Sequence, residues 1–225
     1  MDDRRGLLKD ALVKFTAGII LIGLLIFLPA WDIKWREGWL FMGLLFIPMC
    51  IAGVVMYLKA PDLLRSRLRN KESQGEQKTV IRLSGLMFVA AFVAAGLNHR
   101  FGWMKFPRSM VISGCVVFLC AYIMFAEVLR ENAYLSRVIE VQEGQKVVDT
   151  GLYAVVRHPM YSATVFLFLS MALILDSPIS FIIMLVYIPI IAKRARNEEK
   201  VLEAELEGYT EYEKKVRYRI IPYIW

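Results

Sequence analysis

The sequence predicts an all-α integral membrane protein with five to six transmembrane helices, the last two forming a C-terminal helical hairpin. Its 225 residues are 57% hydrophobic and 22% charged, and their mean hydropathy is +0.48. The charged residues are unevenly spread, so that long segments contain none. A soluble domain of this size could not bury so much apolar surface, and a disordered chain would be far more polar. Uncharged runs of this length are typical of membrane spans.

Four runs in the first 130 residues predict single spans, because a helix needs roughly 20 residues to cross the hydrocarbon layer. They lie at residues 12–31, 39–58, 83–98 and 109–128. Trp31, Trp35, Trp39 and Trp103 stand at or just beyond the ends of these runs, where an indole ring prefers the membrane interface. The N-terminal run has no small-residue cleavage site, so we interpret it as a retained span and not as a signal peptide.

The final apolar stretch, residues 158–192, contains a single charge, at Asp176, and is too long for one helix. Asp176 is expected to cap a new helix, with Pro178 in its first turn. The stretch is therefore predicted to be a helical hairpin with arms at residues 159–175 and 178–193. The polar segment after it has apolar residues at helical spacing, which predicts that the last helix continues beyond the span, with Gly208 and then Pro222 as its expected stops.

The distribution of basic residues predicts that both termini lie in the cytoplasm. Most of the 28 lysines and arginines fall in the N-terminal segment and in segments 59–82, 130–157 and 193–219. The net charge of +7 is thus assigned to membrane orientation, and we expect no nucleic-acid partner. Residues 1–225 are interpreted as one multi-pass domain, with polar segments 130–158 and 194–225 on the cytoplasmic side. We predict contact with membrane lipids but no obligate protein partner.

The three cysteines lie in apolar runs without metal-ligand spacing, so no metal site is predicted. A polar cluster instead flanks the hairpin. Arg157 and His158 precede it, and Arg194, Glu198 and Glu199 follow it. A hairpin returns its two ends to one membrane face, so these residues are predicted to meet. Each also has a simpler interpretation, since arginines at span ends orient helices and a Glu-Glu pair is common on a solvated helix face.

The residues Arg157-His158-Pro159-Met160-Tyr161 and Glu198-Glu199-Lys200-Val201-Leu202 resemble the RHPxY and EExxL signatures of one family. This is the isoprenylcysteine carboxyl methyltransferase-like family of membrane methyltransferases, which are close relatives of phospholipid methyltransferases. The ordered motifs cover about the C-terminal half of the chain, while the first four spans match in layout alone. Leu152 departs from the proline that many relatives carry after the glycine.

The resemblance implies S-adenosylmethionine as the cofactor, bound in a cytoplasmic pocket between the loop before the hairpin and the helix after it. It also implies which residues hold the cofactor, with His158 and either Glu198 or Glu199 facing its zwitterionic end. The implied cofactor-binding residues are Val148, Gly151, Leu152, Tyr153, Arg157, His158, Tyr161, Glu198 and Glu199.

Arg194 and Glu199 are the implied catalytic residues, and Arg194 and Asn132 are implied on the acceptor side. The acceptor would be a lipophilic small molecule or a prenylated substrate that enters from the bilayer. Carboxyl O-methylation is favoured, since a carboxylate needs orientation by an arginine but no base. Three alternatives stay open: N-methylation of a phospholipid amine, an NADPH-dependent enzyme like the membrane sterol reductases, and a non-catalytic membrane protein whose pocket binds a lipid or a partner.

Overall fold

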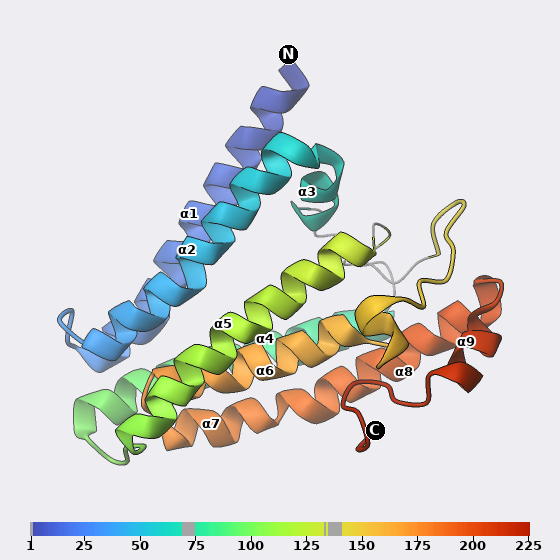
Figure 1. Cartoon of the computed structure of the whole chain (residues 1–225). Coiled ribbons are helices and arrows are strands. Elements are labelled where there is room, and N and C mark those ends of the chain that lie inside the picture. Colours follow the sequence, from blue (N-terminus) through green and yellow to red (C-terminus); the bar gives the residue numbers. More distant parts are fainter. Residues whose placement is uncertain (1, 69–74, 133, 135–140) are drawn as a thin grey trace.

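The computed structural model of the chain describes residues 2–68, 75–132, 134 and 141–225. Its regular structure there is helical throughout, without a strand. Figure 1 shows α5, α6, α7 and α8 running alongside one another, while α1 and α2 form a pair that diverges from them, with the short helix α3 beside the end of α2. The helices are α1 (Asp2–Ala30), α2 (Arg36–Lys59), α3 (Pro61–Leu68), α4 (Gly75–Phe101), α5 (Arg108–Glu131), α6 (Pro159–Ile174), α7 (Pro178–Leu185), α8 (Tyr187–Glu205) and α9 (Tyr209–Lys215), with a 3₁₀ turn at Gly151–Ala154.

Five helical segments of the described chain are long and apolar enough to cross a membrane, which confirms the predicted class. They are Arg4–Ala30, Arg36–Lys59, Thr79–Phe101, Arg108–Glu131 and Pro178–Glu205. The apolar helix α6 is shorter, at 16 residues. It packs along α5 and turns back through residues 175–177 into α7, so the C-terminal hairpin is also confirmed.

The turn of the hairpin differs from the prediction in one residue. The cap of α7 is Ser177, whose hydroxyl accepts a hydrogen bond from the Ser180 amide at 3.2 Å, and Pro178 occupies the first turn as expected. The prediction that Asp176 caps the helix is wrong. Asp176 adopts a left-handed conformation with φ of 52°, and its carboxylate accepts from the Phe106 amide at 2.7 Å. Because the turn is tight, the residue directly before the helix, Ser177, takes the capping position, and Asp176 does not.

The second arm of the hairpin is interrupted once and then continues well past the apolar run. Its helix breaks at Val186, between α7 and α8. Pro189 explains the break, because proline has no amide hydrogen and its ring collides with the carbonyl group four residues earlier, that of Leu185. Beyond the break, α8 runs through the predicted polar segment to Glu205, and Gly208 lies in the left-handed region with φ of 83°. The predicted helical extension is therefore confirmed.

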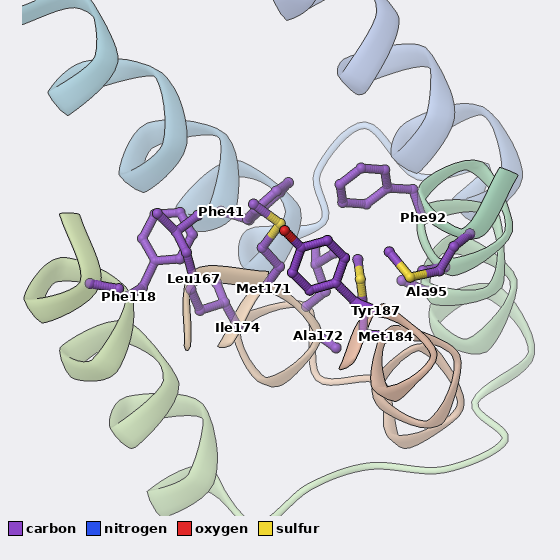
Figure 2. Close-up of a cluster of buried hydrophobic side chains, with 14 of the residues drawn as sticks. Phe41, Phe92, Ala95, Phe118, Leu167, Met171, Ala172, Ile174, Met184 and Tyr187 are labelled. Atoms are coloured by element: carbon purple, nitrogen blue, oxygen red, sulfur yellow. The ribbon is translucent and has the colours of Figure 1, made fainter. Parts of the chain in front are cut away.

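The apolar core joins α1, α2, α4, α5, α6, α7 and α8. Figure 2 shows side chains from α2, α4, α5, α6, α7 and α8 converging on the middle of the bundle. The residues labelled there are Phe41, Phe92, Ala95, Phe118, Leu167, Met171, Ala172, Ile174, Met184 and Tyr187. Both arms of the hairpin contribute to this core, so the ends of the hairpin are held in fixed positions relative to α4 and α5.

The bundle has two chemically distinct ends. The loop end consists of residues 31–35, 102–107 and 175–177, where α1 turns into α2, α4 into α5, and α6 into α7. The pocket end consists of residues 132, 134 and 141–158 together with the last turns of α8, α9 and residues 216–225. In Figure 1 the segment before α6 lies beside α8 and α9 at the pocket end. The predicted polar cluster falls entirely at this end.

Candidate functional site

A pocket opens at the pocket end between the segment that precedes α6 and the last turns of α8. Its wall combines charged groups, aromatic rings and aliphatic side chains from sequence positions more than 70 residues apart. The lining residues are Asn132, Tyr134, Gln145, Lys146, Val147, Val148, Tyr153, Arg157, His158, Met160, Tyr161, Arg194, Glu198, Leu202, Leu206, Tyr209 and Tyr212.

One face of α8 supplies the charged wall of the pocket. Arg194, Glu198 and Leu202 follow one another at intervals of four residues, so their side chains share this face. Tyr161, in the first turn of α6, links the two charged groups. Its hydroxyl accepts from Arg194 Nε at 3.0 Å and donates to Glu198 Oε2. Three predicted site residues thus form one hydrogen-bonded chain across the hairpin.

Glu199 does not line the pocket. Its side chain is 3% exposed and lies behind the wall, on the face of α8 that also carries the buried residue Ala195. Oε1 of Glu199 accepts from Arg157 Nε at 2.8 Å and contacts His158 Nε2 at 3.2 Å. The sequence predicted that these groups meet, and the structure brings them together. Glu198, however, is the carboxylate that faces the pocket.

The position of His158 follows from the proline after it. A residue that precedes proline is disfavoured in the helical conformation, so His158 stands outside the helix as the N-cap residue of α6, with Pro159 at the first helical position. Its ring stacks on Tyr161, with ring centres 5.4 Å apart and planes inclined by 20°. The ring is therefore fixed between Glu199 and Tyr161 and forms part of the pocket wall.

The C-terminal segment completes the network behind the pocket. Arg157 Nη2 contacts Glu213 Oε1 at 2.9 Å, and Arg157 Nη1 donates to the Val216 carbonyl at 3.1 Å. Arg219 Nε donates to Glu199 Oε2 at 2.6 Å. The amide of Arg157 also donates to the Tyr218 carbonyl at 2.9 Å. A buried charge is costly unless it is paired, and both oxygens of Glu199 are paired here.

Gly151 and Leu152, two predicted cofactor-binding residues, face Glu131 instead of the pocket. The amide of Leu152 donates to Glu131 Oε2 at 3.1 Å. Gly151 has φ of 52°, and a Cβ atom there would stand 1.4 Å from Glu131 Oε1. The positive φ favours glycine, and the absence of a Cβ atom leaves room for the Glu131 carboxylate. Gly151 therefore lets the 3₁₀ turn dock on the end of α5, which places the next residues of the turn, including Tyr153, against the pocket.

Tyr153 connects α5, the 3₁₀ turn and α9 beside the pocket. Its hydroxyl accepts from Asn132 Nδ2 at 3.0 Å, and its carbonyl accepts from the Tyr212 hydroxyl at 2.7 Å. Burial raises the pKa of Tyr153 and of Tyr212 well above the usual value of a phenol, so both hydroxyls keep their protons. Val148, another predicted residue, lines the same side of the pocket. Asn132 reaches the pocket together with Tyr153.

A small apolar cluster closes the opposite side of the pocket. It consists of Leu206, Tyr209, Tyr212 and Val216, with Val141, Val147 and Leu202 packed against it. Tyr209 is 4% exposed, and its hydroxyl has no hydrogen-bond partner among the described residues. Burial raises the pKa of Tyr209 far above its usual value, so the group is a neutral hydroxyl. The pocket thus has a charged side and an apolar, aromatic side.

Several residues of this site were not predicted from the sequence. Leu202 and Leu206 extend the interval of four residues that begins at Arg194, so helical spacing alone could have placed Leu202 on the pocket face. No sequence pattern pointed to Arg219 or Glu213 as partners of the buried network, because their positions depend on how the chain returns after α8. Among the described residues, no cluster of potential metal ligands is found.

Two comparisons relate this chain to known proteins. Residues 109–207 match the phospholipid methyltransferase family. The fold is similar to that of the eukaryotic intramembrane Ras methyltransferase ICMT (isoprenylcysteine carboxyl methyltransferase), with a TM-score of 0.54 and 18% identity over 91% of this chain and 74% of that chain. No curated protein matches the sequence. The matched segment runs from α5 past the end of α8 and contains both signature strings, so the predicted resemblance is confirmed.

Proposed function

We propose that this protein is a methyltransferase that uses S-adenosylmethionine. Two findings support the proposal: residues 109–207 match the phospholipid methyltransferase family, and the fold is similar to that of ICMT. The observation that carries this proposal is the pocket itself. Arg194, Tyr161 and Glu198 form a connected charged wall opposite the cluster around Leu206 and Tyr209. This pocket adjoins the two helices of an apolar hairpin, where a lipophilic acceptor can approach.

The residues present fit S-adenosylmethionine by their chemistry. Its amino-acid end carries a carboxylate and an ammonium, which require a donor and an acceptor. The lining offers Lys146 as a cationic donor and Glu198 as a carboxylate acceptor, and His158, whose Nε2 contacts Glu199, contributes its ring to the wall. Its nucleoside end is flat and partly apolar, and Val147, Val148 and Leu206 supply an apolar wall. The unpartnered Tyr209 hydroxyl provides one further polar group on that side.

The proposed roles of the two glutamates differ. Glu198 faces the pocket and would bind the cofactor ammonium, while Glu199 holds Arg157 and His158 in place from behind the wall. When bound, S-adenosylmethionine supplies an electrophilic methyl group on a sulfonium. The protein then has to align the acceptor and exclude water, because the transfer is a direct displacement. Packing of the 3₁₀ turn and α9 against the pocket serves the second task.

We favour carboxyl O-methylation of an isoprenylcysteine-like or other lipid-soluble acid. Arg194 lies on the pocket wall on the hairpin side of Glu198, where a guanidinium would bind an acceptor carboxylate through its planar donor fork. A carboxylate is already a competent nucleophile, so no proton has to be removed. Asn132 would contribute a further hydrogen-bonding group on the acceptor side.

The second candidate is N-methylation of a phospholipid amine, and the family match over residues 109–207 favours it. An amine is protonated near neutral pH and must lose a proton before it attacks the methyl group. Glu198, the carboxylate that faces the pocket, would take that role. The two candidates therefore assign different essential residues on α8: Arg194 for a carboxylate acceptor and Glu198 for an amine.

In both cases the orientation proposed from the basic residues places the pocket on the cytoplasmic side. The water-soluble cofactor would enter from the cytoplasm and the apolar part of the acceptor from the bilayer. Reporter fusions at residues 100–108 and after residue 225 test this arrangement. A cytoplasmic position of residues 100–108 would contradict it.

Direct binding of S-adenosylmethionine to the purified protein, measured by calorimetry with NADPH as the parallel ligand, tests the reaction class. We expect binding of S-adenosylmethionine alone. Binding of NADPH alone would overturn the proposal in favour of a reductase-like enzyme. Transfer of a labelled methyl group to N-acetyl-S-farnesylcysteine or to phosphatidylethanolamine then separates the two acceptor classes.

Replacement of Arg194 by lysine sharpens the acceptor assignment. For a carboxylate acceptor, Arg194→Lys should lower kcat/KM for the acceptor by about tenfold or more, because lysine cannot form the bidentate fork. The dissociation constant of S-adenosylmethionine should change much less. An equal loss of both quantities would move Arg194 to the cofactor side of the pocket.

A further inference from the structure

Arg219 does not line the pocket, but it contacts Glu199, which in turn contacts the pocket residue His158. The carboxylate of Glu199 is shared between three side chains. Oε1 faces Arg157 Nε and His158 Nε2, and Oε2 accepts from Arg219 Nε at 2.6 Å. Arg219 is the partly exposed member of the group, since its side chain is 32% exposed while that of Glu199 is 3% exposed. It thus reaches the buried carboxylate from the outside.

The position of Arg219 is fixed by the segment around it. Its guanidinium lies 5.3 Å from the centre of the Trp225 ring, within the range of a cation–π interaction. Its amide donates to the Trp225 carbonyl at 2.9 Å, and its own carbonyl accepts from the His158 amide at 2.8 Å. The backbone of Arg219 is therefore bonded to the same histidine that its side chain reaches through Glu199.

The hydrogen bond between His158 and Glu199 determines where the imidazole carries its proton. An ionised carboxylate only accepts hydrogen bonds, and two arginines donate to this one. His158 Nε2 must then be the donor in its contact with Glu199 Oε1. That contact fixes the tautomer of a neutral ring and its orientation against Tyr161.

We propose that Arg219 is a positioning residue for the cofactor site. By binding Oε2 it keeps Oε1 of Glu199 directed at His158, and so fixes the ring of the histidine on the pocket wall. The consequence for cofactor binding rests on the proposed function, whereas the state of the ring does not. Without Arg219 the carboxylate rotates towards Arg157, and His158 loses its fixed acceptor.

Arg196 provides a matched control. Its guanidinium lies at the same distance from Trp225, 5.3 Å, but Arg196 is not one of the groups that contact Glu199. Arg196→Ala therefore removes a cation–π partner of the same ring and one positive charge, and it leaves the carboxylate network intact. If Arg219 acted only through its contact with the Trp225 ring, Arg219→Ala and Arg196→Ala would have the same effect.

The state of the imidazole can be observed directly, because the chain contains two histidines and the second, His99, lies at the loop end. We suggest nitrogen-15 NMR of the histidine-labelled protein in nanodiscs, with the His99 signals identified from a His99→Gln variant. In the wild-type protein the His158 signals should show one tautomer, with the proton on Nε2. Arg219→Ala should give averaged tautomer signals, Arg219→Lys should restore the original pattern, and Arg196→Ala should preserve it. His99 should not respond to any of these changes.

Affinity for S-adenosylmethionine supplies the second measurement. Arg219→Ala should weaken it by about tenfold, as loss of a charged hydrogen bond predicts, and Arg196→Ala by less than about twofold. Where Arg219→Ala does not fold, Arg219→Gln takes its place with the same expected NMR result. Unchanged His158 signals in that variant, or equal effects of the two arginine variants, would overturn the inference. Absence of cofactor binding in the wild-type protein would refute the proposed function, and the NMR result would still decide this inference.

Discussion

The two ends of the bundle pair their polar groups by different chemistry. Each end must pair the polar groups of chain segments that leave the apolar helices. The loop end does so with a buried amide: Asn98 Nδ2 donates to the carbonyls of Met104 at 2.7 Å and Asp176 at 3.2 Å. Its contact between Asp32 Oδ2 and His99 Nε2, at 3.1 Å, remains partly exposed. The pocket end instead buries Arg157, His158 and Glu199 almost completely.

The difference supports the proposal that the pocket end is the functional end. A neutral amide satisfies backbone groups at low cost, and the loop end needs nothing more in order to join its helices. Burying ionised groups costs several kcal/mol for each ion before pairing, so a chain that needs only stability gains little from such a network. Charged groups kept beside a pocket and behind its wall are consistent with ligand binding at that end. Substitutions at the two ends should therefore separate stability from binding.

The largest effect is expected for Glu199→Ala. This change leaves Arg157 and Arg219 without their shared carboxylate, and removal of one partner from a buried ion pair costs about 3–5 kcal/mol. The unfolding temperature and the affinity for S-adenosylmethionine should both fall. Thermal unfolding in detergent and calorimetric binding measure the two quantities.

Glu198→Gln is the matched comparison for that variant. Glu198 is adjacent in sequence but faces the pocket, where its carboxylate accepts from Tyr161 and would bind the ligand ammonium. The glutamine can still accept the hydrogen bond, so the unfolding temperature should change little while cofactor affinity falls. A larger loss of stability in Glu198→Gln than in Glu199→Ala would contradict the assignment of the two glutamates.

A smaller effect on stability, with none on binding, is expected for Asn98→Ala. Asn98 is buried, and its amide also accepts from the Met104 amide at 3.1 Å. Its removal leaves backbone groups of two turns unpaired, which costs about 1–3 kcal/mol. The unfolding temperature should fall, and the affinity for S-adenosylmethionine measured below that temperature should equal the wild-type value. A weakened affinity would show that the two ends are coupled through the helices.

The sequence predicted the contrast between these ends only in part. Uncharged runs predicted the spans and the hairpin, and the hairpin alone brought His158 to Glu199. Which glutamate faces the pocket depends on the rotation of α8 about its axis. The sequence contains an indication of this rotation, because Glu199 follows the apolar residues Ile191 and Ala195 at intervals of four, and all three are buried. The contact of Arg219 depends on the path of an irregular segment, which no periodic pattern encodes.

The smallest effect is expected for Asp32→Asn at the loop end, and it is a change in pH dependence. Hydrogen bonds from His99 and from the Lys34 amide lower the pKa of Asp32 below the usual 3.8. A carboxyl group with a lowered pKa stabilises the folded state above its unfolded pKa, and this contribution is lost as the pH falls through the folded value. The unfolding temperature of the wild-type protein should therefore contain a small acid-sensitive part below about pH 4 that Asp32→Asn lacks. Because the pair is partly exposed, high salt should reduce the difference. Cofactor affinity should be the same in both proteins, and a change there would mean that the loop end takes part in binding after all.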